Sequence, residues 1–279
     1  MKVLVTGVSG QLGFDVMREL LARGIEAKGA SRSDFSLTDF AAMRRFVEAH
    51  RPTAIIHCAA YTAVDKAEDE PELCREVNAA ATGKLARLAK EIGAKFLYIS
   101  TDYVFPGTGE DFYEPADEKA PCNVYGESKL LGEEAAREAL EELFIVRISW
   151  VFGENGKNFI KTMLRLAETH EELSVVGDQI GSPTYTRDLA HLLADMIVTE
   201  KYGVYHATNE DTCSWAELAA EALRCAGKKT RVRAIKTEEY PTKAKRPKNS
   251  RLSKKCLDDA GFSRLPDWRD AVARYVELI

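Results

Sequence analysis

Residues 2–13 read KVLVTGVSGQLG, an apolar run that leads into glycines at positions 7, 10 and 13. The apolar run predicts a buried β-strand over Lys2–Thr6, and the residues after the glycines predict a helix from about position 11 to 23. Gly7 would permit a tight turn, Gly10 a close approach of the backbone to a pyrophosphate, and Gly13 close packing of helix on strand. The stretch therefore predicts a dinucleotide-binding site at the start of an α/β fold.

The alternation of strand and helix continues through the first half of the chain. Further strands are predicted over 25–30, 54–58, 95–100 and 143–149, and helices over 39–50, 71–92 and 124–140. Thr38 is the expected cap of the helix that begins at Asp39. Strict alternation is typical of a parallel sheet covered by helices on both faces. We therefore expect an α/β protein with a Rossmann-type, doubly wound parallel sheet.

After Trp150 the regular alternation of strands and helices ends. Helices are predicted over 159–169, 187–199 and 215–226, strands over 174–176 and 204–207, and a loop over 179–185. We expect residues 1–150 to form the NAD(P)-binding domain, with 179–207 returning to it. Residues 151–178 and 208–279 are expected to form a smaller, substrate-binding lobe.

Composition excludes several classes of protein. The chain has 279 residues, a net charge of −5, 45% hydrophobic and 30% charged residues, values typical of a globular protein that is neither collagenous nor disordered. No apolar run is long enough for a membrane span, and the six cysteines are scattered without a metal-binding spacing. We therefore expect a reduced, cytoplasmic protein that binds neither membrane nor nucleic acid.

Positive charge gathers in one segment. Residues 224–255 are rich in Lys and Arg, and Glu238 and Glu239 are their only acidic residues. The segment is either a solvated, loop-rich surface or a cationic wall for a polyanionic ligand such as a nucleoside diphosphate. It lacks the regularly interleaved aromatic residues of a nucleic-acid surface.

A second motif concerns proton transfer. Tyr125 and Lys129 are spaced i, i+4 and share one face of a predicted helix. A neighbouring ammonium favours the phenolate, so Tyr125 could act as a general acid near neutral pH. The spacing alone is common on protein surfaces, but Thr101 adds a hydroxyl at the end of the preceding strand. Together the three residues favour reduction of a carbonyl group.

The turn after the second strand bears on cofactor choice. It reads GASRS over residues 29–33, with no acidic residue before Asp34. In Rossmann folds an acid at this position binds the ribose 2′-hydroxyl of NAD, whereas an Arg accommodates the 2′-phosphate of NADP. Arg32 therefore predicts a preference for NADPH, with NADH still accepted.

These motifs resemble the extended short-chain dehydrogenase/reductase superfamily, and several further stretches resemble its dTDP-4-dehydrorhamnose reductase family. The resemblance spans residues 1 to about 255. The stretches are AAYTAVD (59–65), STDYVF (100–105), YGESK (125–129), SW (149–150), NF (158–159), DQIGSPT (178–184) and RPKNS (246–250).

The resemblance implies a set of roles. Thr101, Tyr125 and Lys129 would be catalytic, with Tyr125 as proton donor and Lys129 bound to the nicotinamide ribose. The cofactor would also contact the glycine loop, the turn and the segment after the third strand: Gly7, Gly10, Gln11, Leu12, Gly13, Arg32, Ala59, Ala60 and Tyr61. The sugar would lie against Thr62, Val64, Tyr103 and Trp150 beside Thr101 and Tyr125, and the nucleoside diphosphate against Asn158, Gln179, Pro183 and Arg246.

The resemblance thus implies NAD(P)H-dependent reduction of the 4-keto group of a dTDP-sugar, dTDP-4-dehydro-L-rhamnose. It leaves room for a homodimer and for Mg²⁺, although no acidic cluster near the C-terminus points to a metal. Two alternatives stay open. One is an epimerase or dehydratase of the same superfamily, although dehydratases place acidic residues beside the Thr and only Asp102 follows Thr101 here. The other is a non-catalytic subunit resembling the regulatory subunit of methionine adenosyltransferase.

Overall fold

A computed structural model describes residues 1–279 and has a six-stranded parallel sheet at its centre. The strand order is β10-β5-β4-β3-β1-β2. The order reverses beside β1, because β2 lies on one side of β1 and β3 on the other. Ligands of such sheets bind at the carboxyl ends of the strands near this reversal. The strands are β1 (Lys2–Thr6), β2 (Glu26–Ala30), β3 (Ala54–His57), β4 (Lys95–Thr101), β5 (Leu143–Ile148) and β10 (Gly203–His206).

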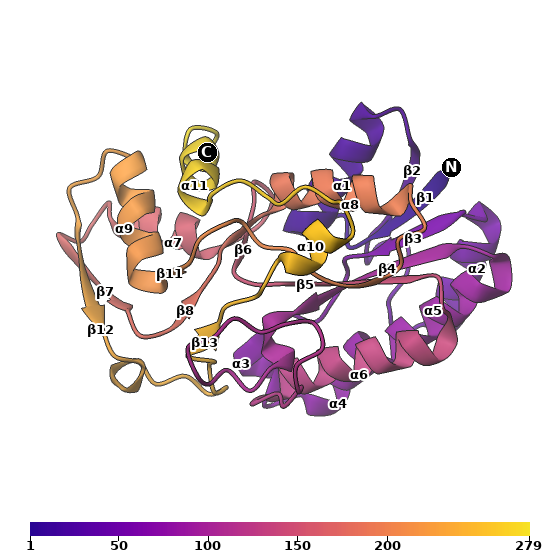
Figure 1. Ribbon diagram of the computed structural model, residues 1–279, viewed down its shortest axis with the longest axis horizontal. Helices are drawn as coiled ribbons and strands as arrows, with labels where there is room; N and C mark the ends of the chain where they lie inside the picture. The colour runs from indigo at the N-terminus through magenta and orange to yellow at the C-terminus, as the bar shows by residue number, and fades with distance from the viewer.

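Helices cover both faces of the sheet (Figure 1). Side chains alternate along each strand, so Val3 and Val5 pack on one face and Leu4 on the other. The first face packs against α1 (Gln11–Ala22) and α8 (Thr186–Ile197). The second packs against α2 (Phe40–His50), α5 (Ala81–Ile92) and α6 (Val124–Ala139). The predicted α/β fold class is confirmed.

Two local predictions need correction. The side chain that caps α2 is Asp39 and not Thr38, since the Asp39 carboxylate accepts the N–H of Ala42 at 2.9 Å. The single helix predicted over 71–92 is built of α4 (Pro71–Arg75), a π-helical turn η1 (Glu76–Ala80) and α5. Such wide turns are frequent at functional sites, and Asn78 lies in this one.

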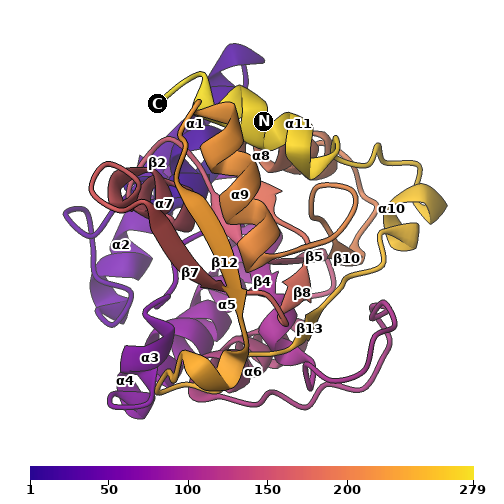
Figure 2. The ribbon, with the colours of Figure 1, turned by 90° about the vertical axis from the view of Figure 1, so that its left-hand side faces the viewer.

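The rest of the chain builds a second lobe from short elements. The predicted strand at 174–176 is longer, β7 (Glu172–Val176), and it pairs with β12 (Arg231–Ile235), a strand the sequence analysis missed. Figure 2 views this lobe with β12 and α9 toward the reader. Its other elements are β6 (Val151–Phe152), α7 (Phe159–Leu166), β8 (Ile180–Gly181), β9 (Thr184–Tyr185), β11 (Cys213–Ser214), α9 (Trp215–Cys225), η3 (Thr237–Glu239), β13 (Asn249–Ser250), α10 (Lys255–Asp259) and α11 (Trp268–Val276).

Two contacts explain how the lobe is held. Ser214 and Glu217 form a reciprocal capping box at the start of α9. Trp268, the first residue of α11, is 1% exposed and lies in an apolar cluster with Phe152, Tyr185 and Tyr275. Helix α11, which the sequence analysis did not predict, thus closes the lobe. None of the helices combines the length and apolar character that crossing a bilayer would require.

Candidate active site

The glycine loop between β1 and α1 is shaped for a close ligand. Gly7 has a φ of +73°, and a Cβ there would lie 2.7 Å from the Ala59 nitrogen. A Cβ on Gly13 would lie 2.4 Å from the Gly7 carbonyl oxygen. Gly10 is the residue just before α1 and has no side chain to cap the helix, so the first N–H groups of α1 stay available to an anion. Gln11 and Leu12 form the first turn behind it. This donor set fits the pyrophosphate of a dinucleotide.

The segment after β3 passes directly against this loop. The Ala59 N–H donates to Thr6 Oγ1 at 3.2 Å, and the Tyr61 N–H donates to Asn78 Oδ1 at 2.8 Å. Asn78 donates back to the Tyr61 carbonyl at 3.1 Å and to Ser128 Oγ at 2.9 Å. The predicted segment Ala59–Tyr61 therefore lies between the glycine loop and helix α6. Asn78 escaped the sequence analysis, because nothing in its local sequence marks a π-helical turn.

The turn after β2 contains a feature that its sequence does not reveal. Arg32 is exposed. The Asp34 carboxylate folds back to the strand end and accepts the Ser31 N–H and hydroxyl, each at 2.8 Å. The backbone hydrogen bond from Ser31 lowers the pKa of Asp34. A carboxylate therefore stands close to the strand end beside Arg32, and it would favour a ribose hydroxyl.

Thr101 and Tyr125 meet at the carboxyl end of β4. Thr101 is the last residue of β4; its hydroxyl donates to Asp102 Oδ1 at 2.9 Å and accepts the Tyr103 N–H at 3.2 Å. The rings of Tyr103 and Tyr125 contact edge to face, with centroids 5.7 Å apart. Burial raises the pKa of Tyr125, an effect that Asp102 reinforces and the Thr101 hydroxyl opposes. Burial also raises the pKa of Asp102 to about 6.

The environment of Lys129 corrects one expectation. Its ammonium donates to the Ile99 carbonyl oxygen at 2.7 Å and lies 4.0 Å from the centroid of the Tyr98 ring. Burial lowers the pKa of Lys129 to about 7, against the opposing charge of Glu133. The predicted lowering of the Tyr125 pKa by Lys129 is wrong for this structure, because burial dominates at Tyr125. The phenol stays protonated, which is the form that a proton donor requires.

A buried ion pair anchors the helix that carries Tyr125 and Lys129. Arg147 of β5 binds both oxygens of Glu133 of α6, at 2.8 and 2.7 Å. The two side chains are 0% and 2% exposed. Ser100 of β4 donates to the same carboxylate at 2.6 Å. The sequence analysis missed this pair, although a single Arg inside the apolar strand LFIVRI was a signal for it.

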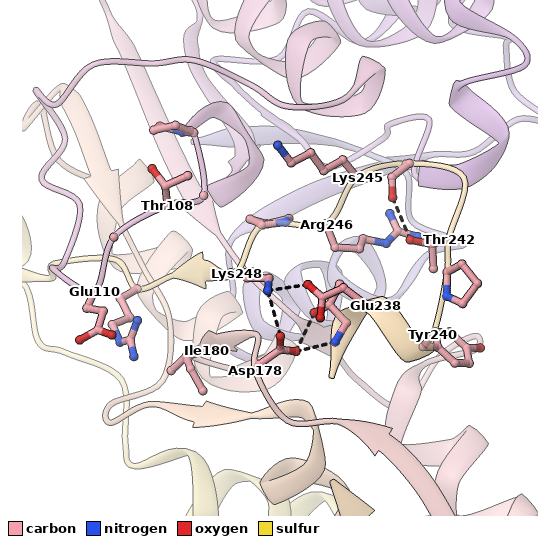
Figure 3. Close-up of a pocket in the computed structure, with 18 of the residues that line it drawn as sticks. Thr108, Glu110, Asp178, Ile180, Glu238, Tyr240, Thr242, Lys245, Arg246 and Lys248 are labelled. Atoms are coloured by element: carbon pink, nitrogen blue, oxygen red, sulfur yellow. Dashed lines mark hydrogen bonds and ion pairs between the residues drawn. The ribbon is translucent and has the colours of Figure 1, made fainter. Parts of the chain in front are cut away.

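A cavity of about 860 Å³ lies between the loop after β4 and the second lobe. Its walls come from the loop 106–110, from Asp178 and Ile180, and from residues 237–248 with Arg251. Lys248 forms ion pairs with Asp178 at 3.1 Å and with Glu238 at 2.8 Å; dashed lines mark both pairs in Figure 3. Five of the thirteen basic residues in segment 224–255 line this cavity: Lys243, Lys245, Arg246, Lys248 and Arg251.

Of the residues expected around the sugar, Tyr103 is the one whose contact with the catalytic group is direct. Thr62 is exposed just before α3 (Val64–Ala67), which Val64 begins. The Tyr103 ring contacts the Tyr125 ring. Burial raises the pKa of Tyr103, and the positive charge of Arg246 opposes part of this rise. Trp150 has a left-handed φ of 50° and stacks on Trp215, with ring centroids 3.9 Å apart.

Three of the four residues expected to face the nucleoside diphosphate do not line the cavity. Asn158 caps α7 and donates to Gln11 Oε1 at 3.0 Å, so it lies beside the glycine loop. Gln179 is 7% exposed and donates to Thr237 at 3.2 Å. Pro183 is buried, and its carbonyl oxygen accepts the Asn209 N–H at 3.1 Å. Only Arg246 reaches the cavity wall. No group of three or more His, Cys, Asp or Glu side chains is arranged to hold a metal ion.

Known proteins resemble this chain both in sequence and in structure. The family model described as the RmlD substrate binding domain matches residues 1–279. The spore coat polysaccharide biosynthesis protein SpsK of Bacillus subtilis is 40% identical over 99% of this chain and 97% of its own length. The dTDP-4-dehydrorhamnose reductase of Escherichia coli is 40% identical over 98% and 96%. The crystal structure of the Bacillus anthracis dTDP-4-dehydrorhamnose reductase in complex with NADP superimposes with a TM-score of 0.97 at 40% identity, over 100% and 99%.

Proposed function

The chain belongs to the RmlD substrate binding domain family, and from this premise we propose that it reduces dTDP-4-dehydro-L-rhamnose to dTDP-L-rhamnose. The reductant is NADPH, with NADH also accepted. The product would supply rhamnose for a cell-surface polysaccharide, in line with the name of the Bacillus subtilis relative. The enzyme is an oxidoreductase that acts on a carbonyl group.

One observation carries the proposal. The hydroxyl-bearing residues Thr101 and Tyr125 meet at the carboxyl end of β4. On one side lie the glycine loop and the segment Ala59–Tyr61, which fit a dinucleotide. On the other side Arg246 connects them to the cavity with the basic wall. A proton donor between a dinucleotide cradle and a cationic cavity is what reduction of a sugar nucleotide requires.

The bound cofactor would supply the hydride. Tyr125 donates its proton to the 4-keto oxygen, and burial keeps that proton in place by raising the pKa of the phenol. The Thr101 hydroxyl, beside the phenol, hydrogen-bonds the same oxygen. Lys129 would hold the nicotinamide ribose, because its ammonium has further protons to donate beside the one that binds the Ile99 carbonyl oxygen.

Direct measurement of turnover tests the reaction. Purified chain, NADPH and dTDP-4-dehydro-L-rhamnose should give stoichiometric loss of NADPH and formation of dTDP-L-rhamnose. An epimerase or dehydratase would change the sugar without net consumption of NADPH. A regulatory subunit would give no turnover at all. Either of these results would refute the reductase.

We extend the proposal to organisation and location. Residues 1–150 with 179–207 would form the NAD(P)-binding domain, a division supported by α8, which packs on α1, and by β10, which pairs with β5. Residues 151–178 and 208–279 would form the sugar-nucleotide lobe. Six unpaired cysteines support a cytoplasmic location. A homodimer is the assembly we propose from the family resemblance, and light scattering after size exclusion would test it.

Lys129→Met should raise the KM for NADPH and lower kcat, each by about tenfold, because a charge-assisted hydrogen bond to the ribose is lost. The lowered pKa of Lys129, about 7, adds a pH signature. The ammonium is present below pH 7 and lost above it, so the wild-type kcat/KM for NADPH should fall as the pH rises through that value. The variant should lack this limb, whereas Lys90→Met, at an exposed position of α5, should retain it. An unchanged pH profile together with an unchanged KM would refute the role.

Arg32→Ala should raise the KM for NADPH by about tenfold, because one charge-assisted bond to the 2′-phosphate is lost. The KM for NADH should hardly change, since its ribose offers only hydroxyls. The nearby Asp34 carboxylate explains why we expect preference for NADPH and not exclusion of NADH. Arg45→Ala, an exposed Arg on α2, is the matched control. A wild-type kcat/KM that favours NADH would contradict the expectation.

A further inference from the structure

One short segment of the basic lobe reaches back to the nucleotide-binding domain. We call residues 243–248, which form part of the cavity wall in Figure 3, the strap. The strap is bound from the other side of the cavity at several points. Asn123 donates to the Lys245 carbonyl oxygen at 2.8 Å, and the Lys248 N–H donates to the Gly107 carbonyl oxygen at 3.0 Å. The position of the strap is thus set by residues outside its own lobe.

Asp65 of the short helix α3 makes the most specific of these contacts. One carboxylate oxygen, Oδ1, accepts the Ala244 N–H at 3.0 Å. The other, Oδ2, accepts Nη2 of Arg246 at 2.7 Å. Both acceptor atoms of one side chain are therefore used on the strap, one on its backbone and one on its guanidinium.

Arg246 keeps an unused donor. Its side chain is 19% exposed, and its other terminal nitrogen, Nη1, has no hydrogen-bond partner although it is buried. A buried guanidinium donor is costly to leave unpaired. Arg246 also lines the cavity, and its charge opposes the rise that burial causes in the pKa of Tyr103, whose ring contacts Tyr125; Arg246 therefore links the cavity to the catalytic residues.

The chain just after α3 also supports the helix of the proton donor. Glu68 accepts the N–H of Val124, the first residue of α6, at 2.9 Å. Asn123, which binds the strap through its amide nitrogen, caps α6 through its oxygen by accepting the Gly126 N–H at 2.8 Å. The strap and the start of the helix that carries Tyr125 therefore share one support.

We propose that Asp65 is a positioning residue, which orients Arg246 and the strap for the diphosphate of the sugar nucleotide. The inference rests on the proposed function for the identity of that ligand. Asp65 binds one edge of the guanidinium and leaves the other edge for a phosphate oxygen, a planar fork suited to that contact. The ion pair with Arg246 also offsets the repulsion that a free carboxylate would exert on a diphosphate.

Asp65→Asn tests the role with little change in shape. The amide can keep one acceptor but loses the charge, so the KM for the sugar nucleotide and the Kd for dTDP should each rise about tenfold. The kcat at saturation and the Kd for NADPH should change less than about twofold, because Glu68 and Asn123, which hold the start of the helix that carries Tyr125, are unchanged. Asp69→Asn is the matched control: Asp69 pairs with Lys243 of the strap, but that pair is more than half exposed, and exposed pairs contribute little.

A double-mutant cycle separates positioning from general structural support. If Asp65 acts through Arg246, Asp65→Asn should add nothing to the loss of dTDP affinity that Arg246→Ala causes. Additive effects, or an unchanged Kd for dTDP in Asp65→Asn alone, would overturn the proposal. Calorimetry with dTDP needs no turnover. A wild type whose dTDP affinity depends on Asp65 but that does not reduce the sugar would therefore refute the proposed function and leave this inference standing.

Discussion

Replacing Tyr125 with Phe should lower kcat by about 10²- to 10⁴-fold, the usual contribution of general acid catalysis. The change removes one oxygen and leaves the ring, so the edge-to-face contact with Tyr103 is kept. The Kd for NADPH should stay within about twofold, because the dinucleotide cradle is built by the glycine loop and the segment after β3. Steady-state kinetics at saturating substrates and a fluorescence titration with NADPH provide the two measurements.

Tyr202→Phe is the matched control for this loss. Tyr202 packs against the core of the first sheet face, away from Thr101 and Lys129, so its hydroxyl should be dispensable for turnover. A Tyr125→Phe enzyme that keeps roughly a third of wild-type activity would rule out Tyr125 as the proton donor, since that loss lies far below the range for general acid catalysis.

Replacing Arg147 with Met should lower the free energy of unfolding by about 3–5 kcal/mol, the cost of leaving a buried charge without its partner. Glu133, which is 2% exposed, would keep the hydrogen bond from Ser100 and a longer ion pair with the half-exposed Arg137, at 3.8 Å. Because Glu133 lies one turn beyond Lys129 on α6, the loss should also reduce kcat by loosening that helix. Denaturant unfolding of the variant and the wild type checks the stability, and turnover checks the second effect.

Two further variants test whether the loss of stability comes from the unpaired buried charge. Arg75→Met breaks an ion pair with Glu127 on the same helix, but there both side chains are more than 40% exposed, so it should cost about 1 kcal/mol or less. Removing both buried charges in Glu133→Leu with Arg147→Met should restore part of the stability, because no charge is left uncompensated. A single Arg147→Met variant as stable as the wild type would show that burial of this pair carries no energetic weight.

Much of the fold follows from patterns that span only a few residues. The apolar run and glycines of residues 2–13 predict β1, the turn and α1, and the structure has them at Lys2–Thr6 and Gln11–Ala22. The regular alternation that follows predicts the parallel sheet. These predictions succeed because a strand needs only continuous apolar side chains, and a glycine turn only its missing Cβ atoms.

The elements that the sequence analysis missed have weaker local signals. Strand β12 carries Arg231 and Arg233, whose side chains are largely exposed, and it is stabilised by pairing with β7. Helix α11 is short and packs through Trp268 and Tyr275 onto residues distant in the sequence. Both elements form because segments distant in the sequence pair with them or pack against them, as is usual for short helices and strands.

The sequence by itself determined the fold class, the glycine cradle and the presence of Thr101, Tyr125 and Lys129 on the elements that carry them. Only the tertiary structure decided what surrounds them. Arg246 and Asp65 are 181 positions apart, and no local pattern pairs them. Asn158 lies against Gln11 because two loops meet there. The pKa of Tyr125 is raised because burial outweighs the hydrogen bond with the Thr101 hydroxyl. A charge pair or a pKa depends on distance and desolvation in the folded chain, and spacing along the sequence specifies neither.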